Sequence, residues 1–98
     1  MEKFFYRVQK GDSLAALSSR FNLPQTVIIN DNGLSDEVKE GDVVLIRKLS
    51  GTVYRVKPFD TLESVAERFN VSAKTLSAAN NVDYLFYGLN LIIPERDL

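Results

Sequence analysis

The chain has 98 residues, a net charge of −1 from 12 basic and 13 acidic side chains, and neither cysteine nor histidine. This composition excludes disulfides and the commonest zinc sites, and the interspersed charges argue against a nucleic-acid groove. No apolar run approaches the roughly 18 residues of a membrane-spanning helix, and no signal peptide precedes the first patterned segment. A hydrophobic content of 45% indicates a folded chain.

The strongest pattern in the sequence is a duplication. The segment from Tyr6 to Asn22 recurs, 48 positions later, from Tyr54 to Asn70. A repeat with this spacing marks a duplicated structural unit, so we predict two units, residues 1–48 and residues 49–98. Units this small bury little apolar surface. Each unit is therefore expected either to pack very economically or to bury surface against the other.

In the first copy, residues 4–8 are β-branched and aromatic enough to form a strand. Asp12 and Ser13 are both good helix N-caps, because a short side-chain oxygen can accept from the unpaired N–H groups of a first turn. An apolar stripe with helical spacing follows and ends at Phe21. Asn22 can adopt the left-handed conformation that terminates a helix.

A second helix is expected after Pro24, although residues 26–29 are β-branched and by themselves favour a strand. The matching residues 72–79 begin with a capping serine and contain good helix formers, so we predict a helix in both copies. Residues 30–34 predict a turn, and residues 43–46 predict the strand that closes the unit.

The second copy repeats this order. We predict a strand over residues 52–56, a helix capped by Thr61, a second helix that ends near Asn80, and a closing strand over residues 91–93. The closing strands align with an offset of 47 rather than 48, so one loop differs by a residue. The predicted fold class is α+β, with two βααβ units, each a two-stranded antiparallel sheet with both helices on one face.

These motifs resemble the LysM domain: Tyr-x-Val, Gly-Asp-Ser-Leu, a helix that ends in Phe-Asn, and a closing Gly-x-x-Leu-x-Ile-Pro at residues 88–94. The resemblance covers about residues 5–47 and 52–95. It implies a βααβ fold that binds polysaccharides containing N-acetylglucosamine, such as peptidoglycan and chitin.

In the LysM family the ligand groove lies between the loop after the first strand, with the start of the first helix, and the loop after the second helix. Carried onto the first unit, the resemblance gives Gly11, Asp12, Ser13, Leu14, Asn30, Asp31, Asn32 and Gly33. Carried onto the second unit, it gives Phe59, Asp60, Thr61, Leu62, Ala78, Ala79, Asn80 and Asn81.

Some of these residues have simpler interpretations. Capping or turn formation accounts for Asp12 and Asp60 better than sugar contact does. For Asn32 and Asn80, turn chemistry and ligand binding explain the residue about equally well.

Aromatic residues set the second copy apart. Phe59 stands where the first copy has Gly11, and it either blocks the groove or forms a stacking platform. Tyr84, Phe86 and Tyr87 follow the second helix. These four aromatics favour packing between the repeats, a protein partner or self-association over a carbohydrate platform.

The sequence contains no candidate catalytic centre, since it has no histidine or cysteine and no serine beside a recognisable base. We therefore predict a non-catalytic carbohydrate-binding module without metal or cofactor, directed most of all at peptidoglycan. Both grooves are expected to bind, the first more surely. The alternative is a protein-interaction or assembly module, as in LysM-like proteins of spore coats and the cytoplasm. A glycan-binding role implies the cell wall or spore surface, with synthesis in the mother-cell cytoplasm.

Overall fold

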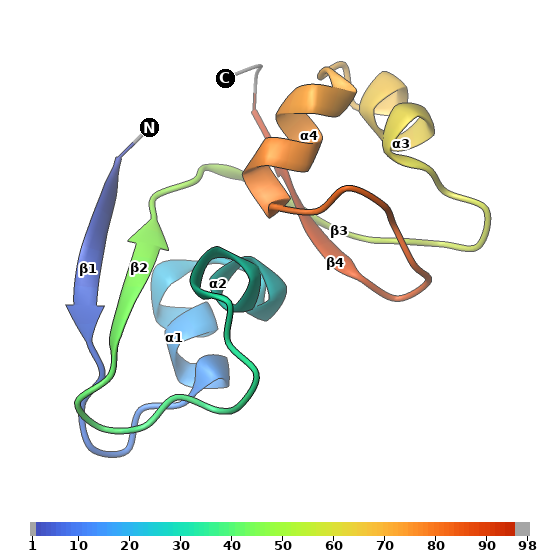
Figure 1. Cartoon of the computed structure of the whole chain (residues 1–98). Helices are drawn as coiled ribbons and strands as arrows, with labels where there is room; N and C mark the ends of the chain where they lie inside the picture. The colour runs from blue at the N-terminus through green and yellow to red at the C-terminus, as the bar shows by residue number, and fades with distance from the viewer. Residues whose placement is uncertain (1, 96–98) are drawn as a thin grey trace. The chain divides into compact units, whose positions relative to one another are not determined.

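A computed structural model describes residues 2–95, and the chain divides into two compact units between Lys48 and Leu49. Each unit has the order strand–helix–helix–strand, which confirms the predicted α+β fold (Figure 1). The elements of the first unit are β1 (Lys3–Arg7), α1 (Leu14–Phe21), α2 (Gln25–Asn32) and β2 (Val43–Arg47). Those of the second are β3 (Gly51–Arg55), α3 (Leu62–Arg68), α4 (Ala73–Asn80) and β4 (Asn90–Pro94).

Each unit closes by pairing its first strand with its last. β1 and β2 are antiparallel with Phe5 opposite Leu45, and β3 and β4 are antiparallel with Val53 opposite Ile92. The second helix of each unit packs against the closing strand, α2 on β2 and α4 on β4. Beyond the paired strands of the first unit, Val8 donates to Asp42 O and accepts from the Gly41 N–H, so the loop after β1 lies beside the end of the loop that follows α2.

The helix α2 forms despite its β-branched sequence. Val27 and Ile28 are almost fully buried, and the helix contacts both α1 and β2. Tertiary burial therefore outweighs the strand preference of these residues, as the comparison with the second copy predicts.

Most predicted helix ends are confirmed by their caps. The Ser13 hydroxyl accepts from the Ala16 N–H at 3.1 Å, so Ser13 rather than Asp12 is the N-cap of α1. Asn22 is left-handed at φ 56° and ends that helix. In the second unit, Thr61 and Ser64 form a reciprocal capping box at the start of α3.

The predicted turn over residues 30–34 begins too early. The helix α2 continues to Asn32, and Gly33 at φ 60° is its left-handed cap. The extra residues stay helical because the Asn32 side chain bonds to β2, as described below.

Candidate functional site

The loop after β1 is held by a side-chain network that the sequence analysis did not assign. The Tyr6 hydroxyl donates to Asp12 Oδ2 at 2.5 Å, and the Gln9 N–H donates to the same oxygen at 2.8 Å. Arg20 completes the network through Tyr6 Oη at 2.8 Å and Asp12 Oδ1 at 3.0 Å. Asp12 is therefore a turn-forming residue whose carboxylate is occupied within the fold.

The second unit repeats this network almost unchanged. Tyr54 donates to Asp60 at 2.5 Å, the Lys57 N–H donates at 2.8 Å, and Arg68 reaches both side chains at 2.9 and 3.1 Å. The hydrogen bond from the tyrosine, followed by the one from the backbone and the arginine contact, lowers the pKa of Asp12 and of Asp60 to about 2. Both carboxylates are thus ionised at neutral pH and fix the loop by charge-assisted hydrogen bonds.

Asn32 and Asn80 clamp the second helix of each unit to the closing strand. The Asn32 amide accepts from Leu45 N at 2.7 Å and donates to Leu45 O at 3.0 Å. Asn80 makes the same pair with Ile92, at 2.8 and 2.9 Å. Each asparagine side chain therefore bonds to the backbone N–H and C=O of one residue of the closing strand, as a further strand would. These backbone groups point away from the paired strand and would otherwise lack a partner.

These contacts show what three residues of the expected ligand set do within the fold. Asn80 is only 2% exposed and Ala79 is fully buried, so both side chains belong to the packing of α4 on β4. Asp31 forms a two-point ion pair with Arg47 at 2.7 and 3.0 Å, and its side chain is 6% exposed. A sugar that bonded to the Asn80 or Asp31 side chain would have to replace an interaction that the fold already makes.

Glu37 joins the two loops of the first unit. Its Oε1 accepts from the Leu14 N–H at 2.7 Å and from the Val38 N–H at 2.9 Å. The first backbone donor of α1 is thus occupied by a side chain of the same protein. The sequence analysis missed Glu37, which lies 23 residues from Leu14 and outside the patterned segments.

The remaining groove residues lie in the two loops and at the helix ends beside them, and they differ in exposure. Gly11, Asn30, Gly33, Thr61 and Asn81 are exposed, whereas Leu14 is buried. The backbone at these loop positions, together with the exposed side chains, is what a ligand in the groove would meet.

The loops of the second unit carry a cluster of exposed aromatic residues. Phe59 is fully exposed, and Tyr84, Phe86 and Tyr87 are 69%, 54% and 70% exposed. The rings of Tyr84 and Phe86 contact each other, with centroids 6.5 Å apart. We call these four residues the aromatic loop residues. Their two loops meet at the base, where the Gly88 N–H donates to Val56 O at 2.9 Å.

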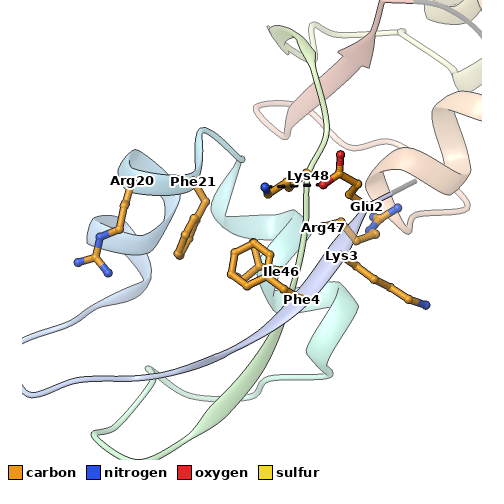
Figure 2. A pocket seen from close by; sticks show the side chains of 8 residues that line it. All are labelled: Glu2, Lys3, Phe4, Arg20, Phe21, Ile46, Arg47 and Lys48. Atoms are coloured by element: carbon orange, nitrogen blue, oxygen red, sulfur yellow. Dashed lines mark ion pairs between the residues drawn. The ribbon is translucent and has the colours of Figure 1, made fainter.

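A hollow of the first unit lies away from this groove. It has a volume of about 610 Å³ and lies between the start of β1, the end of β2 and the end of α1 (Figure 2). Phe4 and Phe21 meet edge to face on its wall, with centroids 5.5 Å apart, and Lys48 pairs with Glu2 at 3.7 Å on its rim. The second unit has Thr52 in place of Phe4, so this wall is not duplicated.

A smaller hollow of about 340 Å³ lies beside the candidate groove of the second unit. It is lined by Ser77, Ala78, Asn81, Val82 and Asp83. Among residues 2–95, no group of acidic side chains gathers closely enough to hold a metal ion. Within the same residues, none of the helices has the length and apolar character that a membrane span requires.

The duplicated motifs correspond to a known family. The model of the LysM domain matches twice, at residues 6–47 and 54–94. The chain belongs to the LysM family. Domains of the LysM family bind glycans such as peptidoglycan.

Proteins similar to this LysM chain include an autolysin and two spore cortex-lytic enzymes. An autolysin of Enterococcus faecalis is 25% identical over 113 residues, which cover 93% of this chain and 15% of the autolysin. Crystal structures of the spore cortex-lytic enzyme SleL from Bacillus megaterium and Bacillus cereus are 32% and 27% identical, with TM-scores of 0.48 and 0.46. They match over 92% and 98% of this chain but only 22% and 23% of their own length. The chain therefore spans less than a quarter of each of these proteins.

Proposed function

We propose that the two LysM units form a non-catalytic module that binds N-acetylglucosamine-containing polysaccharide, with peptidoglycan as the principal ligand. The observation that carries the proposal is the duplicated loop frame. In both units a Tyr–Asp–Arg network fixes the loop after the first strand, and an asparagine clamp fixes the end of the second helix. Two fixed loops can recognise a sugar at a low entropic cost of ordering.

The chemistry of an N-acetyl group suits loops of this kind. The group offers an amide donor, a carbonyl acceptor and a methyl group, which loop backbone and a small apolar notch can accommodate. A shallow site of this type binds weakly. Two sites on one chain can raise the avidity by roughly 10²–10⁴-fold if both engage the same polymer.

The two matches to the LysM family model and the similarity to an autolysin support this choice of ligand. In such proteins a LysM pair that anchors the chain to its polymer would keep a catalytic domain near its substrate. We assign this anchoring role to the present chain without assigning it any reaction.

The test is retention on insoluble peptidoglycan and on chitin. The double variant Ser13→Arg/Thr61→Arg places a long charged side chain at the mouth of each groove, and because it also removes two helix caps, its retention is measured below its own melting temperature, where it is folded. Ser19→Arg/Thr52→Arg is the matched control, because it changes the same residue types by the same charge at exposed positions outside the grooves. We expect wild type and control to be retained on peptidoglycan and the groove variant to be lost. Equal retention of all three, or retention of none, would contradict the proposal.

A second candidate function is protein interaction through the aromatic loop residues. The observation in its favour is their exposure, since clustered aromatic side chains are typical of protein interfaces. Sedimentation analysis of the wild type across a range of concentrations tests self-association. A concentration-dependent dimer that Phe59→Gly abolishes would support this candidate.

A further inference from the structure

The two LysM units carry the same frame but different loop surfaces. Phe59 occupies the position of Gly11, and the offset of 47 residues places Tyr84 at the position of Glu37. The same offset places Phe86 and Tyr87 at the positions of Lys39 and Glu40. Three charged residues and a glycine in the first unit are therefore all aromatic in the second.

Phe59 is held in an unfavourable backbone conformation. Its φ is 70°, close to the 87° of Gly11, and this left-handed region disfavours a side chain with a β-carbon. The ring is also fully exposed, so burial within the unit does not offset the strain. A strained, solvent-exposed aromatic residue at a loop tip points to a contact outside the unit.

In the first unit, Glu37 hinders contact between a ligand and the groove. Its carboxylate lies between the two loops and takes the Leu14 N–H, with a donor–acceptor distance of 2.7 Å. A sugar carbonyl that approached this donor would have to displace a charged acceptor of the protein. The tyrosine at the matching position of the second unit has no carboxylate and is mostly exposed.

We propose that the two LysM units divide the work of binding, with the second unit as the primary glycan site. The aromatic loop residues stack on the sugar rings, and Glu37 keeps the first groove closed until it is displaced. This inference rests on the proposed function. The four aromatic positions carry no charge, so charge complementarity favours an uncharged N-acetylglucosamine oligosaccharide over a charged peptide. Flat rings also present large, rigid faces to the C–H groups of a pyranose.

The test is an amide NMR titration of the full chain with the N-acetylglucosamine hexamer, which follows each unit separately. In the wild type we expect amides of the second unit to respond at lower sugar concentration than those of the first. Phe59→Gly should raise the half-saturating concentration in the second unit by about five- to tenfold. The same variant should raise its melting temperature by roughly 2–5 °C, because the backbone strain is relieved.

Glu37→Ala should let amides around Leu14 titrate, and Glu40→Ala is the matched control in the same loop. Phe5→Ala is the control for Phe59→Gly, because it removes an exposed ring from the sheet face of the first unit.

The outcomes separate this inference from the proposed function. Equal response of both units in the wild type, or unchanged binding by Phe59→Gly, would overturn the division of work and leave glycan binding intact. A lower melting temperature for Phe59→Gly would also overturn it, since the ring would then be packed within the protein. Absence of any response, in the wild type and in every variant, would instead contradict the proposed function.

Discussion

The two units form an internal comparison, in which one fold is built twice with different surfaces. The Tyr–Asp–Arg networks agree to within 0.1 Å in their side-chain hydrogen bonds, for example 2.8 and 2.9 Å from arginine to tyrosine. The asparagine clamps agree as closely. By contrast, the loop tips differ in charge and aromatic content. The comparison indicates that residues shared by both copies fix the loops, and that residues that differ decide what the loops contact.

The two units also differ in how the second helix packs against the closing strand. The first unit contains the Asp31–Arg47 ion pair, whereas the second has Ala79 and Pro94 at the matching positions. Both Ala79 and Pro94 are buried. A buried ion pair and an apolar pair therefore solve the same packing problem between the second helix and the closing strand.

The largest expected effect comes from breaking that ion pair on one side. Asp31→Ala takes the Asp31 carboxylate away from the Arg47 guanidinium, whose side chain is only 12% exposed, and we expect the first unit to lose about 3 kcal/mol of stability. Urea unfolding, followed by hydrogen exchange in each unit, measures the loss. Asp31→Ala/Arg47→Met imitates the apolar solution of the second unit and should recover most of it. A double variant no more stable than the single one would show that the ion pair cannot be replaced.

The asparagine clamps give the next largest effect. Asn80→Ala leaves the N–H and C=O of Ile92 without partners in a buried site, and we expect a loss of about 2–3 kcal/mol in the second unit. Asn32→Ala should destabilise the first unit less, because Asn32 is only partly buried and water can reach Leu45. Hydrogen exchange at Leu45 and Ile92 reports each clamp separately. Equal losses in the two units would contradict the role assigned to burial.

The Tyr–Asp–Arg networks should respond equally. Tyr6→Phe and Tyr54→Phe each remove one hydrogen bond to a carboxylate, and we expect each unit to lose about 1 kcal/mol. A clear difference between the two losses would mean that the networks are not equivalent despite their matching distances.

The same variants have a predicted pH dependence. The pKa of Asp12 and Asp60 is lowered to about 2 in the folded chain, so their stabilisation is complete above pH 4 and is lost as the pH falls towards 2. Removal of the tyrosine hydroxyl raises the folded-state pKa towards its ordinary value. The variants should therefore lose less additional stability than the wild type on acidification from pH 4 to pH 2. Urea titrations at both pH values measure this difference, and identical losses would contradict the assignment.

Much of the fold could be predicted from the sequence, because each helix and strand occurs twice and the two copies could be compared. The helix over the β-branched residues 26–29 is the clearest case, since only the matching residues 72–79 favour a helix on their own. The end of α2 was placed too early because the Asn–Asp–Asn–Gly sequence favours a turn, although the predicted helix end near Asn80 in the second copy matches Asn32.

The site was less predictable. Tyr6 and Arg20 recur at the same spacing in the second copy, and that identity was a usable signal for the network. Glu37 gave no such signal, because the matching position in the second copy is Tyr84 and Glu37 meets Leu14 only in the folded unit. The left-handed backbone conformation of Phe59 is indicated in the sequence only by the glycine at the matching position, and its full exposure is not indicated at all.

The central claim is that the second unit, with its uncharged aromatic loops, is the first to bind sugar. Residue-resolved titration of the wild-type chain with the N-acetylglucosamine hexamer tests it most directly. The account predicts that amides near Phe59 and Tyr84 shift at the lowest sugar concentrations, while those near Leu14 stay unchanged. Shifts that begin near Leu14, or that begin in both units together, would contradict it.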